Sequence, residues 1–215
     1  MISLTLQSSK SCVSVALYRK SKILSFIKLK KKEIKRTENL MQLLEKLLKD
    51  FHGKQISQII FTRGPGSFTA IRSVTAIAQG LALGCGAKLK TLSTFEAILG
   101  SFDFFMPKCV VIFRDSREEF LYQFFKQTSS GGLMKNKINS GDLKKIKNAI
   151  NRSSSRGKLI IVSDQRYKIF SDPFFKKHLL KIIEYDAKSL FKAHSKGYSS
   201  KSIKPIYFFK HYANL

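Results

Sequence analysis

The segment Phe61–Gly84 constrains the fold more than any other part of this chain. It reads FTRGPGSFTAIRSVTAIAQGLALG, so an apolar run ends at the turn Gly64-Pro65-Gly66 and a long run rich in small residues follows. A strand, a tight glycine turn and a helix in this order are typical of an α/β fold. We predict that Ser67 caps this helix and that Gly84 ends it.

The turn does not match either of two common phosphate-binding motifs. A Walker A loop requires a lysine that this segment lacks, and a dinucleotide-binding loop requires a third glycine where Thr69 stands. The N–H groups at the start of the helix can still hold an anion. The glycines can equally serve only to permit positive φ angles in a sharp turn. The loop chemistry favours the turn, and both interpretations stay open.

The predicted helix has two different long faces. Ile71, Val74, Ala78 and Leu81 form the face expected to cover a sheet. The other face carries small residues at i, i+4, i+7 and i+11, namely Thr69, Ser73, Ala76 and Gly80. Small residues let a second helix approach closely. The pattern alone does not decide whether that helix belongs to the same domain or to another chain.

The pattern of the first hundred residues indicates a mixed sheet with flanking helices. Three short alternating runs in residues 2–29 predict an antiparallel meander. A helix with a broad leucine stripe follows at residues 38–49, with Thr37 as its predicted N-cap. Further strands are expected at 55–62 and 88–92, and Ser93 is expected to cap a third helix.

A second lobe is predicted to begin near Pro107, which divides the chain into 1–104 and 105–215. Strands are expected at 108–113, 119–125 and 159–164, and helices at 143–150, 173–182 and 186–195. Residues 128–141 are predicted to be a loop, and the residues after 195 to form an irregular tail. Both halves together predict the α/β class.

The formal net charge of +26 in 215 residues is the most unusual bulk property. A field of this size favours polyanionic partners such as RNA. A biased codon usage explains it equally well, because 31 of the 40 cations are lysines rather than the arginines that bind phosphate in bidentate fashion. Three cysteines and four histidines are scattered without metal-binding spacing, so no metal site is expected. No apolar run is expected to approach the length needed to cross a membrane, and no signal peptide is evident, so a cytoplasmic protein is predicted.

The segment GPGSFTAIRSVTAIAQGLALG, followed by LSTFEAI, resembles the signature of the TsaB (YeaZ) family. KRTENLMQLLEKLL is similar to the first helix of that family, and VVIFRDSREEFLYQFF is similar to its hairpin, through Asp115, Arg117 and Tyr122. KPIYFFK resembles the closing segment. The resemblance covers nearly the whole chain.

The resemblance implies two ribonuclease H-like lobes of the actin, sugar-kinase and Hsp70 superfamily. It also implies a non-catalytic subunit that binds the catalytic subunit TsaD and acts with the ATPase TsaE. Together they form the threonylcarbamoyl group on adenosine 37 of tRNAs that read ANN codons. By this resemblance the first two helices bind TsaD, and an isolated chain satisfies the same surface by forming a homodimer. The implied contact residues are Leu40, Met41, Leu44, Leu48, Thr69, Ser73, Ala76 and Gly80.

Departures from the family pattern bear on catalysis. Gln7 or Ser8 stands where the superfamily's ATP-handling members carry an aspartate, and Arg36 replaces a histidine. No catalytic residue and no cofactor are therefore expected in the isolated chain, while a nucleotide at the partner interface stays open. Two alternatives remain: an active kinase or ATPase of the same superfamily, and a free-standing basic RNA-binding protein.

Overall fold

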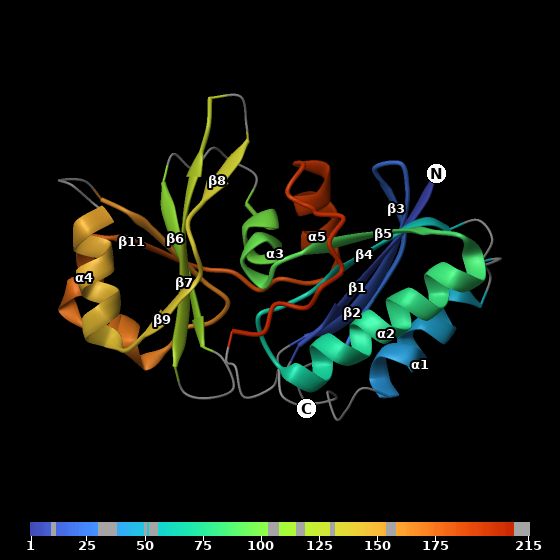
Figure 1. The fold of residues 1–215 in the computed structure, drawn as a ribbon, viewed down its shortest axis with the longest axis horizontal. Helices are drawn as coiled ribbons and strands as arrows, with labels where there is room; N and C mark the ends of the chain where they lie inside the picture. The colour runs from blue at the N-terminus through green and yellow to red at the C-terminus, as the bar shows by residue number, and fades with distance from the viewer. Residues whose placement is uncertain are drawn as a thin grey trace. The chain divides into compact units, whose positions relative to one another are not determined.

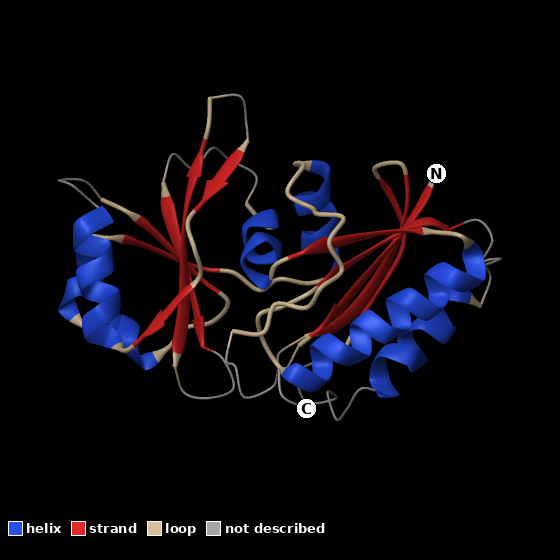
Figure 2. Cartoon of the chain, viewed as in Figure 1, coloured by secondary structure: helices blue, strands red, loops and turns tan. Residues whose placement is uncertain are grey.

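The structure is a computed structural model. It describes residues 1–9, 12–29, 38–49, 51, 56–102, 108–114, 119–129, 132–153 and 158–208. The chain divides into two compact units, the first made of residues 1–100 and 185–215 and the second of residues 101–184. Figure 1 shows the elements of each unit, and Figure 2 shows the same ribbon by secondary structure.

The first unit contains one five-stranded mixed sheet with the strand order β3-β2-β1-β4-β5. Its elements are β1 (Ile2–Ser8), β2 (Val13–Arg19), β3 (Lys22–Lys28), α1 (Glu38–Leu48), β4 (Ile56–Thr62), α2 (Phe68–Cys85), β5 (Lys88–Leu92), α3 (Thr94–Gly100) and α5 (Ala187–Ser195). The first three strands form the predicted antiparallel meander. β4 pairs parallel with β1, and β5 pairs parallel with β4.

Helices cover both faces of this sheet (Figure 1). α1 and α2 share a hydrophobic core with one face, where Leu4 and Leu6 of β1 are fully buried. On the opposite face, Tyr18 of β2 stacks on Phe191 of α5 with ring centroids 3.7 Å apart. Successive strand residues point to opposite faces, so the alternation seen in the sequence supplies both cores.

The second unit contains a six-stranded sheet with the path β11-β10-β6-β7-β8, and β9 also pairs with β7. Its elements are β6 (Cys109–Arg114), β7 (Phe120–Gln127), β8 (Leu133–Lys135), β9 (Asn139–Gly141), α4 (Leu143–Ser153), β10 (Ile160–Ser163), the 3₁₀ turns η3 (Lys168–Ser171) and η4 (Pro173–Lys177), and β11 (Leu179–Ile182). α4 buries Ile146 and Ile150 completely in the core of this unit.

Two segments of the second unit differ from the prediction. The expected loop at 128–141 contains β8 and β9, which both pair with β7. The expected helix at 173–182 is instead η4 followed by β11, which runs parallel to β10. Short apolar runs do not separate helix from strand by periodicity, so the available hydrogen-bonding neighbour decides.

The last part of the chain returns to the first unit, whereas the sequence placed all of 105–215 in the second lobe. The observed division after residue 100 lies near the predicted one after 104. α5 packs against α3, where a Cβ on Gly100 would lie 2.8 Å from the Cβ of Ala193 and would also meet the carbonyl oxygen of Ser189. The backbone N–H of Ala187 donates to Ser14 Oγ at 2.9 Å. α5 thus covers an apolar sheet face that no local pattern could assign to it.

Candidate protein-interaction face

The Gly-Pro-Gly turn connects β4 to α2, and both its backbone conformation and the atoms packed around it restrict which residues it can contain. The Gly64–Pro65 peptide is cis, and Gly64 has φ of +95°. A Cβ at Gly64 would lie 2.8 Å from the carbonyl oxygen of Ile206, so both space and conformation require glycine here.

The carbonyl groups of this turn accept hydrogen bonds from the start of α3. The N–H of Thr94 donates to Gly64 O at 2.9 Å, and its hydroxyl donates to Pro65 O at 2.7 Å. Ser93 caps α3 as predicted, because its side chain accepts the backbone N–H of Glu96. The side chain of Glu96 accepts the backbone N–H of Ser93 in return, which the sequence did not predict. The two sequence motifs GPGSF and LSTFEA are therefore parts of one structural unit.

The predicted ends of α2 are only partly right. Ser67 occupies the N-cap position, but its side chain makes no capping hydrogen bond. Its carbonyl oxygen accepts the N–H of Ile71 instead. The helix continues past Gly84 to Cys85 and ends at Gly86, which has a φ of 69° in the left-handed region. Gly84 and Gly86 are both residues that can end a helix, and the helix ends at Gly86. The predicted N-cap of α1, Thr37, lies outside the described residues.

The small-residue face of α2 points to solvent. Thr69, Ala76 and Gly80 are exposed and Ser73 is half-buried, while Ile71, Val74 and Ala78 are buried against the sheet. A Cβ built at Gly80 meets nothing within 4 Å. Among the residues that the structure describes, no helix uses the close approach that these residues allow. A face for another chain, the second interpretation from the sequence, stays a proposal.

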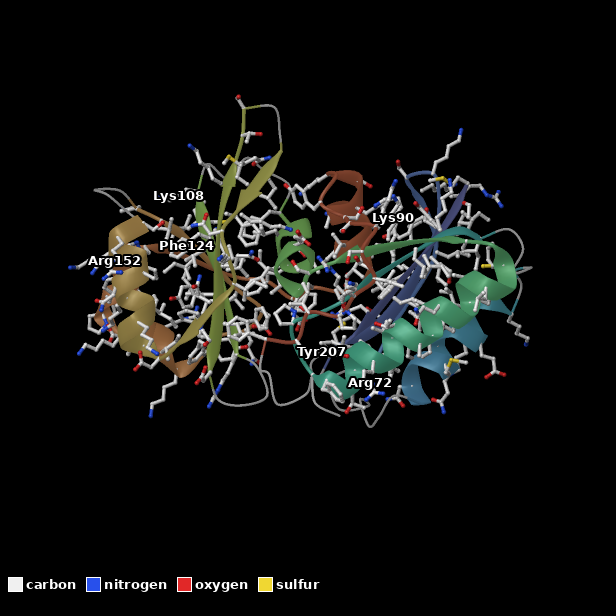
Figure 3. All side chains as sticks on the ribbon, in the orientation of Figure 1. Arg72, Lys90, Lys108, Phe124, Arg152 and Tyr207 are labelled. Atoms are coloured by element: carbon white, nitrogen blue, oxygen red, sulfur yellow. The ribbon has the colours of Figure 1, made fainter. Side chains whose placement is uncertain are left out.

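Leu83 belongs to the same face, and the sequence reasoning missed it. It is 87% exposed, the largest exposed fraction among the large hydrophobic residues that the structure describes. It lies three positions after Gly80, so continuing the i+3/i+4 series by one step finds it. Near the other end of α2, the guanidinium of Arg72 lies 5.1 Å from the ring centre of Phe68, and Phe68 packs against Tyr207. Arg72 and Tyr207 are labelled in Figure 3.

The contribution of α1 needs a correction. Leu40 and Leu44 are 0% and 3% exposed, so they belong to the protein's own core and not to its surface. Leu48 is half-buried against the same core. Only Met41 of the four predicted apolar contacts is well exposed, at 54%. The broad leucine stripe faces inward, because α1 needs most of it to cover β2 and β3.

By length and composition alone, α2 could cross a membrane. It has 18 residues with a mean hydropathy of 1.2, and 17% of this stretch is buried. The expectation that no apolar run approaches that length was wrong. One such helix is weak evidence for a membrane span, and here one side of α2 packs on the sheet of a folded unit. The other side of α2 faces out from that unit and carries small and polar residues together with the exposed Leu83.

The end of β1 carries the amide of Gln7, at the position where the resemblance implies an aspartate for an ATP-handling protein. Gln7 is buried, and its Oε1 accepts the hydroxyl of Thr62 at the end of β4, at 3.1 Å. The described residues contain no group of three or more His, Cys, Asp or Glu side chains able to hold a metal ion. Asp115 and Arg117 of the predicted hairpin lie outside the described residues.

Comparison with known proteins supports the predicted family. Residues 32–150, more than half of the chain, match the model of the family "TsaD: tRNA N6-adenosine threonylcarbamoyltransferase". The "tRNA threonylcarbamoyladenosine biosynthesis protein TsaB" of Buchnera aphidicola subsp. Acyrthosiphon pisum (strain APS) is 33% identical over 95 residues. That alignment covers 43% of this chain and 42% of the relative, so it spans less than half the length of either protein.

Solved structures show the same fold over almost the whole chain. YeaZ from Pseudomonas aeruginosa superposes with a TM-score of 0.71 at 16% identity, covering 96% of this chain and 99% of that one. A protein described as similar to peptidase YeaZ from Pseudomonas aeruginosa has a TM-score of 0.73 at 15% identity, with coverage of 97% and 99%. These likenesses confirm the predicted α/β fold of two mixed sheets with flanking helices. Because the matched family model spans more than half of the chain, this chain belongs to the family of that model, and the curated relative and the YeaZ fold support the predicted resemblance to TsaB (YeaZ).

Proposed function

We propose that this chain is a non-catalytic subunit that binds a TsaD-type catalytic subunit through the outward side of α1 and α2. The assembly, with a TsaE-type ATPase, forms the threonylcarbamoyl group on adenosine 37 of tRNAs that read ANN codons. The observation that carries the proposal is the outward face of α2, where Thr69, Ala76 and Gly80 are exposed and Leu83 is 87% exposed. Exposed apolar side chains beside small residues in this arrangement suit a protein-interaction site.

The shape of the face supports a helix as the contacting element. Ala76 and Gly80 are exposed and carry little or no side chain, so a partner helix can approach at the short end of the 8–10 Å range of packed helices. Leu83 and Met41 supply apolar area that loses contact with water on binding. In an isolated chain the same apolar area favours a homodimer.

The end of β1 supports a subunit without independent ATP hydrolysis. A magnesium nucleotide needs carboxylate oxygens near its phosphates, and the amide of Gln7 is engaged with Thr62. This observation favours the scaffold over the rival ATPase. A nucleotide held jointly with the partner stays compatible with the proposal. In this proposal the assembled complex binds the tRNA, and it does so in the cytoplasm.

The test is co-expression with the TsaD of the same organism, followed by size-exclusion chromatography. Ala76→Glu puts a charge on the small-residue face and should abolish co-elution. The matched control is Ser195→Glu, which adds the same charge to an exposed residue of α5, the helix on the other face of the sheet. It should leave the complex intact.

Three outcomes would overturn the proposal. Co-elution that survives Ala76→Glu would mean that another face binds the partner. Loss of co-elution in both variants would mean that charge alone weakens the complex. Steady ATP hydrolysis by the purified wild-type chain without partners would favour the enzyme alternative. Circular dichroism of each variant shows that the fold is retained.

A further inference from the structure

A second surface, distinct from α1 and α2, carries concentrated positive charge. All charged residues of α4 are cations, and three of them, Lys144, Lys145 and Arg152, are exposed. We propose that this outward face of α4 binds the phosphate backbone of RNA. The inference goes beyond the proposed function, which requires only a protein partner for α1 and α2.

The arrangement of these residues forms one continuous stripe. Lys144, Asn148 and Arg152 follow one another at i, i+4 and i+8, and Lys145 lies beside them. Residues at this spacing share one side of a helix. Lysine, arginine and asparagine side chains all donate hydrogen bonds to phosphate oxygens. Arg152 is labelled in Figure 3 on the α4 ribbon.

Nearby carboxylates form no ion pair with this stripe among the described residues, although Glu119 and Asp142 line one hollow together with Lys145. Asp172 pairs with Lys147 at 2.6 Å, and this contact also lowers the pKa of Asp172. Asp142 accepts the backbone N–H of Lys145 as a helix cap. In the described part of the chain, no carboxylate forms an ion pair with Lys144, Lys145 or Arg152. Their charge therefore faces solvent.

Codon bias alone does not explain the position of this charge. A general excess of lysine would affect all exposed helix faces, yet the 18 residues of α2 contain one arginine and no lysine. α1 carries both signs, with Glu45 beside Lys46. The 11 residues of α4 contain three lysines, one arginine and no acid. α5 also carries two lysines and no acid within its nine residues, so α4 is the most cationic of the described α-helices, while cations are nearly absent from α2.

A membrane surface fits α4 less well than RNA. Basic amphipathic helices bind membranes by inserting their apolar side among the lipids. In α4 that side is occupied, because Ile146 and Ile150 are completely buried in the core of the second unit. Only the cationic side is available, and a rigid stripe of cations complements a phosphate backbone.

The experiment measures binding of the purified full chain to a transcript of a tRNA that reads an ANN codon, over a series of salt concentrations. The test variant is K144Q/K145Q/R152Q. Because each phosphate contact contributes about 0.7–0.9 to the slope of log K against log salt, the slope should fall by about two to three. The affinity at low salt should fall by about tenfold or more.

The matched control is K22Q/K88Q/K201Q, which removes the same charge from three exposed lysines of the first unit. It should keep the wild-type slope and an affinity within about twofold. The charge-conserving variant K144R/K145R/R152K should bind like wild type. Thermal unfolding shows whether all variants remain folded, as expected for exposed positions.

Equal losses in the test and control variants would overturn the proposal, since binding would then depend only on total charge. An unchanged slope in the test variant would overturn it too. The proposal would also be overturned if the three substitutions weakened binding of the full chain to vesicles that contain anionic lipid and left its binding to the tRNA unchanged. Because co-elution with TsaD depends on α1 and α2, failure here is distinguishable from failure of the proposed function.

Discussion

At the scale of single residues, Gly64 and Gly80 show how one residue type serves two purposes. We expect Gly64→Ala to lower the free energy of unfolding by about 2–4 kcal/mol, because it combines a strained backbone with overpacking. The added Cβ would meet the Ile206 carbonyl oxygen at 2.8 Å and Cδ1 of Ile71 at 2.7 Å, at a φ of +95°. Urea unfolding followed by circular dichroism measures the change.

Gly80→Ala is the matched control on the same segment. Its Cβ meets nothing within 4 Å, so the usual gain of about 0.5–1 kcal/mol for alanine over glycine inside a helix is expected. A loss of stability at Gly80, or no loss at Gly64, would contradict this assignment. The sequence suggested both roles, but only the positions of neighbouring atoms separated them.

At the scale of elements, the close contact between α3 and α5 makes the returning helix part of the first unit. Ala193 is completely buried next to Gly100. We expect Ala193→Leu to destabilise the protein by about 1–3 kcal/mol, because a well-packed core does not accept three more carbon atoms without displacement. The midpoint of urea unfolding measures it.

Ala76→Leu on α2 is the corresponding control, since the same change at an exposed helix position normally alters stability by less than about 0.5 kcal/mol. If both variants were equally stable, α5 would not be packed as described. Small residues occur both at the contact between α3 and α5 and on the outward face of α2. Burial alone distinguishes the internal contact from the exposed face.

At the scale of the whole molecule, the lowered pKa values of two histidines lead us to expect that the free energy of unfolding depends on pH. Burial lowers the pKa of His178 and of His194 below the usual 6.5, and Lys177 and Lys90 respectively add to the effect. Nδ1 of His178 accepts the N–H of Leu159 at 3.4 Å, which requires that nitrogen to be unprotonated.

The folded protein therefore favours the neutral imidazoles, while the unfolded chain takes up protons near pH 6.5. The stabilisation is fully present above pH 6.5 and is lost as the pH falls below it towards the lowered values. We expect the urea midpoint to be lower at pH 5.5 than at pH 7.5. The double variant His178→Gln/His194→Gln should show a smaller difference between the two pH values. An equal difference would assign the pH dependence to other groups.

The sequence by itself determined the features that depend on near neighbours. These are the antiparallel meander, the glycine turn before α2, the cap of α3 by Ser93, and the small-residue face whose exposure the structure shows. Each depends on backbone conformation, side-chain size or hydrogen bonds within a few residues of the chain. Local patterns report such interactions directly.

Only the tertiary structure decided which leucines of α1 face inward, that residues 179–182 form a strand, and that α5 joins the first unit. These outcomes depend on partners far away in the sequence: Leu40 on the sheet that it covers, β11 on β10, and Ala193 on Gly100. The sequence of a segment does not specify which distant surface the segment will pack against. Burial of apolar area and completion of backbone hydrogen bonds settle that choice only when the whole chain is folded.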